Sequence, residues 1–198
     1  MSTAITTDQV KALREETGVS VMQCKKALEE AGGDVEKARV ILRKKSGEIA
    51  AKKVDRIFGS GTIAGYIHVT GKVGSMVELL SETDFVSGND GFKTLARDIA
   101  MHVAATNPKF LKKEDIKESD MKAAKEVFAE EVRGKPADMQ AKILDGKLAA
   151  YFGEMVLLDQ PFVKDPNITI RAMIEAAVQK FGEKIEISRF ARFGVLEK

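Results

Sequence analysis

The sequence predicts an α+β protein, with a small helical domain, a linker, and a core of about three antiparallel strands packed with helices. Apolar residues recur every three or four positions between residues 6 and 45, which is the period of helices. They alternate with other residues at positions 61–80 and 184–195, which is the period of strands. Helical spacing returns between these two stretches, so the core combines helices with a sheet.

Residues 1–45 are predicted to form a three-helix domain. Thr6 and Ser20 are each followed three residues later by glutamine, the spacing of a capping box that begins a helix. Asp34 follows a glycine pair, which ends one helix and starts another. A unit of this size lies near the lower limit for independent stability and would gain from a neighbour. The apolar positions expected to face inward are Val10, Leu13, Cys24, Ala27, Leu28, Ala31, Val35, Ala38 and Leu42.

Residues 46–60 are interpreted as a partly helical linker, because the stretch around them is basic and lacks a continuous apolar stripe. A solvated connector is one interpretation, and a contact surface for an acidic partner is the other. The basic residues concerned are Lys44, Lys45, Lys52, Lys53 and Arg56.

Residues 61–198 are expected to form the α+β core. Gly71, Lys72 and Gly74 suit the turn of a β-hairpin. The other expected elements are a helix from Gly91 to about Thr106, an antiparallel helical hairpin over 119–153 broken at Gly134–Pro136, a helix over Thr169–Phe181 and a third strand within Lys184–Val195.

Composition excludes several functional classes. The chain has 32 Lys and Arg against 30 Asp and Glu, so it lacks the broad basic field that drives nucleic-acid binding. Its single cysteine, Cys24, permits neither an intrachain disulfide nor a multi-cysteine metal site, and it suits a reducing compartment. We find neither a targeting segment in Met1–Thr7 nor a run of about 18 apolar residues, so we expect a cytoplasmic protein without a membrane segment.

The glycine patterns do not predict a cofactor. Gly59, Gly61 and Ala64 fit a dinucleotide-binding pattern, but that pattern functions after a strand and before a helix, whereas the order here is reversed. A second pattern ends at Lys72 and resembles a phosphate loop, but its spacing is one residue too long and the hydroxyl residue is missing. We therefore expect no direct nucleotide binding.

Catalytic and metal-binding residues are also not predicted. His68 and His102 have no adjacent Ser or Cys nucleophile and no third imidazole for a zinc site. His102 lies near the apolar side of its helix and is interpreted as a packed core histidine. His68 alternates with Ile67 and Val69, which leaves it free for a surface contact. Cys24 is interpreted as a small buried residue.

The connector between the hairpin and the next helix, residues 82–90, is polar except for one large ring, Phe85. One interpretation is that Phe85 folds back into the core. The alternative depends on a family resemblance that covers nearly the whole chain.

The chain closely resembles the elongation factor Ts family. The matching segments are Leu13, Arg14, Thr17 and Gly18; Met22 and Cys24–Leu28; Thr83–Val86 with Gly91 and Phe92; Ile99–Ala105; and Gln160–Val163. The resemblance implies a guanine-nucleotide exchange factor, not an enzyme, whose partner is the GTPase elongation factor Tu. It also implies that the three-helix domain is similar to ubiquitin-associated domains and that residues 119–153 correspond to the family's coiled-coil arm.

The resemblance also implies which residues bind the partner. Asp84 and Phe85 match the family's exchange element, here Thr83–Val86, which would insert near the magnesium and phosphate sites of Tu and allow GTP to reload. The matching docking residues of the N-terminal domain are Arg14, Val21, Met22 and Lys25, and those of the core are His68, Val163 and Lys164. For Val21 and Met22 the alternative is burial of one of them within the domain, because consecutive helical residues do not face the same way.

The chain has room for one core subdomain, whereas longer family members carry two in tandem. The resemblance to the short form implies a homodimer that binds Tu in a 2:2 complex, with contacts from His68, Val163 and Lys164 made by a different protomer than Phe85. Two other functions compete with this one: an adaptor for ubiquitin-like folds, and a small enzyme that uses His68 or His102.

Overall fold

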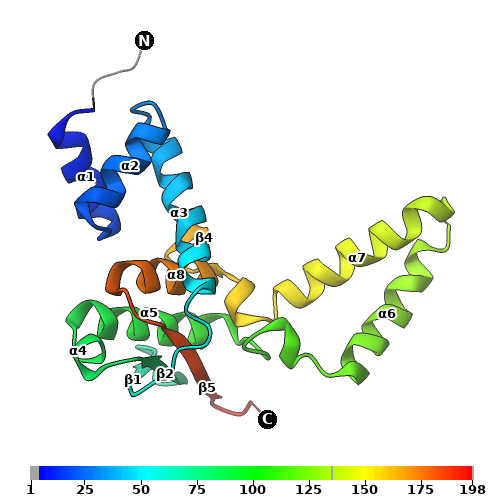
Figure 1. The fold of residues 1–198 in the computed structure, drawn as a ribbon. Helices are drawn as coiled ribbons and strands as arrows, with labels where there is room; N and C mark the ends of the chain where they lie inside the picture. The colour runs from blue at the N-terminus through cyan, green and yellow to red at the C-terminus, as the bar shows by residue number, and fades with distance from the viewer. Residues whose placement is uncertain (1–4, 135, 198) are drawn as a thin grey trace. The chain divides into compact units, whose positions relative to one another are not determined.

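A computed structural model describes residues 5–134 and 136–197. Helices and antiparallel strands are mixed along the chain, which confirms the predicted α+β class (Figure 1). The chain divides into two compact units, each built from separate stretches of sequence. The first comprises Met1–Ala64, Val77–Arg97 and Arg171–Ser188, and the second comprises Gly65–Met76, Asp98–Ile170 and Arg189–Lys198.

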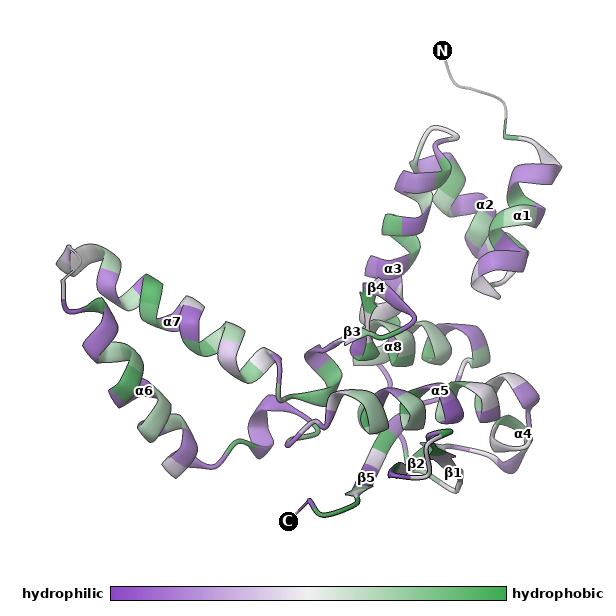
Figure 2. Ribbon diagram, turned by 180° about the vertical axis from the view of Figure 1, so that it is seen from behind, coloured by the Kyte–Doolittle hydropathy of each residue, from purple (hydrophilic) through white to green (hydrophobic). Residues whose placement is uncertain are grey.

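Three helices begin the first unit, and they pack against one another (Figure 1). They are α1 (Thr7–Thr17), α2 (Val21–Glu30) and α3 (Val35–Ala51). Hydrophobic and hydrophilic residues are interleaved along each of them, as expected for helices with one buried face (Figure 2). Their shared core consists of Val10, Leu13, Val19, Cys24, Ala27, Leu28, Ala38 and Leu42.

The predicted helix starts are observed, with one difference. Thr6 and Gln9 form both bonds of a capping box, with Gln9 N donating to Thr6 Oγ1 at 3.2 Å and Thr6 N donating to Gln9 Oε1 at 3.0 Å. Ser20 accepts a hydrogen bond from Gln23 N at 3.4 Å, but the Gln23 side chain does not return the bond. It accepts from Gln179 of α8 instead, at 2.9 Å. A tertiary contact has therefore replaced half of the local motif.

The sheet contains three strands in the order β1-β2-β5. They are β1 (Ser60–Ile67), β2 (Val73–Ser81) and β5 (Glu186–Gly194). His68 N donates to Val73 O at 2.9 Å across the β1–β2 turn, where Gly71 has a φ of 66° that favours glycine. Val195 N donates to Lys72 O at 2.9 Å, so the end of β5 lies beside the start of β2 and the two strands are antiparallel.

Helices α4, α5 and α8 complete the elements that contribute to the first unit. They are α4 (Asp84–Ser87), α5 (Asp90–Thr106) and α8 (Ile170–Phe181), the last two within one residue of the predicted bounds. Phe92 of α5 is fully buried, and its ring meets that of Phe181 edge to face, with centroids 6.2 Å apart. This aromatic pair joins the start of α5 to the end of α8.

In the second unit, α6 (Glu118–Val132) and α7 (Ala137–Gly153) run antiparallel beside each other (Figure 1). Ala124, Leu148 and Phe152 form the buried contact between them. Two short strands, β3 (Pro161–Phe162) and β4 (Asp165–Thr169), pair where the sequence predicts only a loop. The short 3-10 helices η1 (Lys113–Asp115) and η2 (Leu157–Asp159) flank the helix pair in sequence. No helix in the described parts of the chain is long and apolar enough to cross a membrane.

Candidate partner-binding site

The Thr83–Val86 element lies directly after strand β2 and forms most of α4, a helix of 4 residues. Ser87 N donates to Thr83 O at 3.3 Å and Gly88 N donates to Asp84 O at 2.8 Å, which closes a single turn. The sequence predicts a polar connector here. The structure shows a helical turn within it, and Ser87 Oγ also donates to Asp84 O at 3.1 Å.

The side chains of this turn divide into buried and exposed ones. Val86 and Ser87 are buried, whereas Thr83 and Asp84 are exposed and Phe85 is 85% exposed. The interpretation that Phe85 folds back into the core is therefore wrong, because Val86 takes the inward position of the turn. Because the hydrophobic contribution of a side chain scales with the apolar area it buries, Phe85 contributes little to the stability of this fold, and its ring is accessible to a partner.

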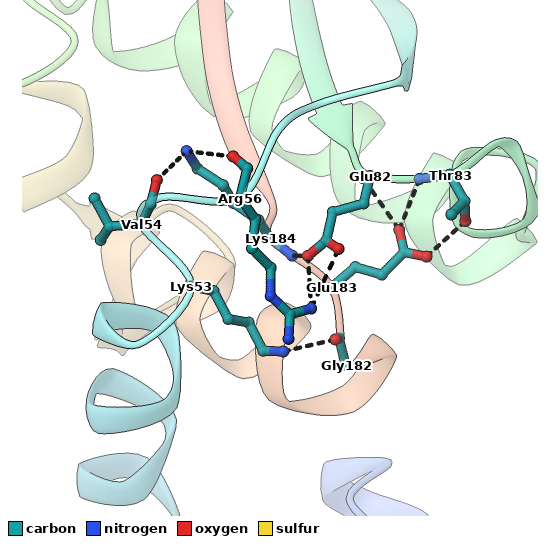
Figure 3. A network of polar contacts seen from close by, with 8 residues as sticks. All are labelled: Lys53, Val54, Arg56, Glu82, Thr83, Gly182, Glu183 and Lys184. Atoms are coloured by element: carbon teal, nitrogen blue, oxygen red, sulfur yellow. Dashed lines mark hydrogen bonds and ion pairs between the residues drawn. The ribbon is translucent and has the colours of Figure 1, made fainter.

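Two glutamates hold the start of this turn from outside it. The Glu183 carboxylate accepts hydrogen bonds from Glu82 N at 3.1 Å, Thr83 N at 3.0 Å and the Thr83 hydroxyl at 2.5 Å (Figure 3). The Glu82 carboxylate in turn accepts from Lys184 N and from Arg56 Nη1, the latter at 3.1 Å. Partial burial would raise the pKa of Glu82, but the hydrogen bonds from Lys184 and Arg56 outweigh it, and the pKa lies below its usual value.

The linker is hydrogen-bonded to the residues on either side of Glu183. Lys53 Nζ donates to Gly182 O at 2.8 Å, and Lys184 Nζ donates to Val54 O at 2.6 Å (Figure 3). The Lys184 ammonium also lies 4.4 Å from the centre of the Phe58 ring. Lys53, like Arg56, therefore binds the protein's own chain, which favours the connector interpretation of this stretch over an acidic-partner surface for these two residues.

The docking residues predicted in the N-terminal domain, Arg14, Val21, Met22 and Lys25, are all exposed. Met22 is 64% and Val21 49% exposed, so neither takes an inward position and the burial alternative for them is wrong. The buried residues of α2 are Cys24, Ala27 and Leu28. Val21 and Lys25, four residues apart, are neighbours on the surface of the helix.

Helix α8 is bonded to the three-helix domain through Gln179. Its amide oxygen accepts from Ser46 Oγ of α3, and its amide nitrogen donates to Gln23 Oε1 of α2 at 2.9 Å. At Gly18, between α1 and α2, a Cβ atom would lie 3.0 Å from the Lys180 side chain. The docking residues and the Thr83–Val86 element therefore belong to the same compact unit.

His68, Val163 and Lys164 lie in the second unit, and all are exposed. His68 follows the end of β1, in the hairpin turn, where its Nδ1 lies 2.9 Å from Thr70 Oγ1. Val163 and Lys164 form the turn between β3 and β4, and Lys164 Nζ pairs with Asp98 at 2.7 Å. These three residues occupy turns with exposed side chains.

The second unit also exposes an apolar sheet face. Gly74 and Met76 share a face of β2, and a Cβ on Gly74 would lie 3.5 Å from Ile67 Cγ1, which places Ile67 on that face. The pairing of Val195 with Lys72 places Phe193 opposite Gly74, on the same face. Ile67 is 76%, Phe193 70% and Met76 50% exposed. Ser75 points to the other face, where it donates to Ala100 O of α5 at 2.5 Å.

His102 is fully buried, as predicted for a core histidine. Its Nε2 lies 2.9 Å from Gln160 Oε1, which also accepts from the Thr106 hydroxyl at 2.9 Å. Burial lowers the pKa of His102, and the hydrogen bond to Gln160 opposes this effect only in part. The imidazole is therefore a neutral structural group. Among the described residues, no cluster of three or more His, Cys, Asp or Glu could hold a metal ion.

Sequence reasoning missed Glu183 and Glu82. Each contacts the Thr83–Val86 element or the residues around it, yet Glu183 stands about 100 positions away in the chain, and no local pattern links it to the turn. One signal was present. The predicted third strand begins near Lys184, and pairing it with the end of the hairpin strand would have brought residue 183 beside residue 83.

Comparison with known proteins gives a consistent result. The family model described as "Elongation factor TS" matches residues 3–197. "Elongation factor Ts" of Thermodesulfovibrio yellowstonii is 49% identical over 193 residues, covering 97% of this chain and 96% of that protein. The proteins of that name from Koribacter versatilis (47% identical, 96% of this chain, 88% of that protein) and Herpetosiphon aurantiacus (44%, 97% and 98%) are similar over the same extent.

Proposed function

The chain belongs to the elongation factor Ts family, whose members are nucleotide exchange factors of translation elongation rather than catalytic enzymes, and we propose that it releases GDP from elongation factor Tu. The observation that carries this proposal is the exposure of Phe85 on an anchored helical turn. The chain offers its partner a bulky apolar ring on a support that its own fold holds in place. We place this activity in the cytoplasm.

The proposed mechanism is differential binding. A protein that binds no nucleotide itself accelerates release only by binding the GTPase more tightly when the nucleotide is absent, and this coupling is reciprocal. Phe85 would insert near the magnesium and phosphate sites of Tu, while the exposed Asp84 carboxylate would compete there for a polar group. Burial of one phenylalanine supplies about 1.5 to 3 kcal/mol, so a larger acceleration requires a second contact.

The second contact in this proposal is the N-terminal domain, which resembles a ubiquitin-associated domain. Arg14, Val21, Met22 and Lys25 present two apolar and two basic side chains to solvent. Their binding would add affinity at a distance from the nucleotide site. His68, Val163 and Lys164 would contact Tu through the turns of the second unit.

We further propose that the working unit is a homodimer forming a 2:2 complex with Tu. Support comes from the face defined by Ile67, Met76 and Phe193, which exposes large apolar side chains on one side of a sheet. A second copy could cover this face with the same residues, as twofold symmetry requires.

The test is to mix the purified chain with Tu loaded with a fluorescent GDP and to follow release by stopped flow. The expected result is a release rate that rises with concentration of the chain and then saturates. A rate equal to spontaneous release would overturn the proposed function. A parallel binding assay with immobilised ubiquitin should show no binding, since capture there would favour the adaptor function instead.

A further inference from the structure

We propose that Glu183 is a positioning residue for nucleotide release, whose carboxylate fixes the orientation in which Phe85 is presented to the GTPase. This inference rests on the proposed function and goes beyond it by assigning a role to a residue outside the exchange element. It is drawn from the polar contacts of Gly182, Glu183 and Lys184, in the segment between α8 and β5 (Figure 3).

The turn that carries Phe85 is too short to be stable alone. A helix of 4 residues has barely completed its costly first turn. Thr83, its N-cap residue, forms no side-chain capping bond to the helix. Its hydroxyl donates to Glu183 instead, so a residue distant in sequence takes the place of the usual side-chain cap.

The remaining contacts hold other parts of the turn. Val86 is buried, and Ser87 Oγ lies 2.8 Å from Ser60 Oγ, which secures the end of the turn. Ser81 Oγ donates to Thr83 O at 2.9 Å. Among the residues that the structure describes, only Glu183 accepts from the two successive backbone N–H groups of Glu82 and Thr83, where the chain leaves β2 and enters the turn. The direction of that exit sets the direction in which the Phe85 side chain points.

A carboxylate suits this position because it can accept all three hydrogen bonds at once, and bonds to a charged acceptor are stronger than neutral ones. One oxygen accepts both backbone N–H groups and the other accepts the Thr83 hydroxyl. The carboxylate also belongs to a residue that the neighbouring bonds hold still: Gly182 O accepts from Lys53, and Lys184 N donates to Glu82. The two neighbours of Glu183 therefore hold its backbone in place.

The experiment measures GDP release from Tu by stopped flow, with the maximal rate and the half-saturating concentration determined separately. Glu183→Ala should lower the maximal rate by roughly tenfold, the effect of losing a charge-assisted hydrogen bond, and leave the half-saturating concentration nearly unchanged. Glu183→Gln should recover most of the rate, because its amide oxygen can accept both N–H groups and the Thr83 hydroxyl can reverse its role. Glu48→Gln is the matched control, since it removes an exposed carboxylate from α3 of the same unit, outside the contacts around Glu183, and should behave as wild type.

A double-mutant cycle with Phe85→Ala shows whether Glu183 acts through the ring. If it does, Glu183→Ala has no further effect once Phe85 is absent. Equal slowing in both backgrounds, a wild-type rate for Glu183→Ala, or a change in the half-saturating concentration alone would each overturn the assignment. If Glu183→Ala does not fold, Thr83→Val takes its place, since it replaces the hydroxyl that donates to Glu183 with a methyl group. If instead Phe85→Ala itself releases GDP normally, it is the proposed function of Phe85 that fails.

Discussion

The chain offers a matched pair of phenylalanines with which to separate folding from function. Phe85 is 85% exposed, whereas Phe92, seven positions later, is fully buried with its ring against Phe181. Phe85→Ala should change the free energy of unfolding by no more than about 0.5 kcal/mol, as expected for an exposed side chain. Phe92→Ala should lower it by about 3 to 5 kcal/mol, because it leaves a cavity in the core.

In the release assay Phe85→Ala should have the larger effect of the two substitutions. If Phe85 is buried in Tu only when the nucleotide leaves, its loss removes about 1.5 to 3 kcal/mol of coupling, which is roughly a 10- to 150-fold fall in release rate. Phe85→Leu should retain much of this rate, since it keeps most of the apolar surface. Urea unfolding and stopped-flow release with fluorescent GDP measure the two quantities. A Phe85→Ala variant with wild-type release, or with a loss of stability like that of Phe92→Ala, would refute the reasoning.

Three further predictions concern other surfaces and the buried histidine. Met22→Glu should raise the half-saturating concentration for Tu about tenfold and leave the maximal release rate unchanged, as a titration of the release rate would show; a lower maximal rate would contradict a pure docking role. Phe193→Glu should shift sedimentation from dimer toward monomer, because it places a charge on the proposed interface; an unchanged dimer would exclude that sheet face. The lowered pKa of His102 means that the unfolded chain binds its proton more readily, so the free energy of unfolding should fall as the pH drops below about 6.5. His102→Gln should reduce that pH dependence in urea unfolding, whereas substitution of the exposed His68 should not; equal curves for both variants would refute the assignment.

The larger elements follow from the sequence because each spans several periods of its own pattern. Helix α1 begins at a capping box that the sequence shows, and α5 and α8 each repeat their apolar spacing several times. Helix α4 and the strand pair β3–β4 are too short to show any period, so they appear as loops in the sequence. Length, rather than composition, limits what the pattern can reveal.

The site could be predicted only in part, for a different reason. The resemblance implies which residues form the proposed exchange element, but the tendency of phenylalanine to be buried wrongly predicts that Phe85 lies in the core. The orientation of Phe85 depends on burial of its neighbour Val86 in the core, and on a carboxylate that is distant in sequence, that of Glu183. The burial of Val86 and the hydrogen bonds to Glu183 are both tertiary contacts, which the spacing of residues in the sequence does not indicate. The half-formed capping box at Ser20 has the same origin, since Gln179 takes the side chain that the local motif would use.

The hydrogen bonds of Gln179 have a consequence for affinity, because they connect the two surfaces proposed to bind Tu, the N-terminal domain and the turn that carries Phe85. Helix α8 holds the three-helix domain through this residue and, at its end, leads into Gly182 and Glu183, which hold the linker and the Phe85 turn. In the proposed complex, binding of the N-terminal domain would therefore make the arrival of Phe85 an intramolecular event, governed by an effective concentration rather than by the bulk one. A flexible connection between the N-terminal domain and Phe85 would lower this effective concentration, because Phe85 would sample a large volume. The hydrogen bonds of Gln179 restrict that volume, so binding of the N-terminal domain would favour binding of Phe85.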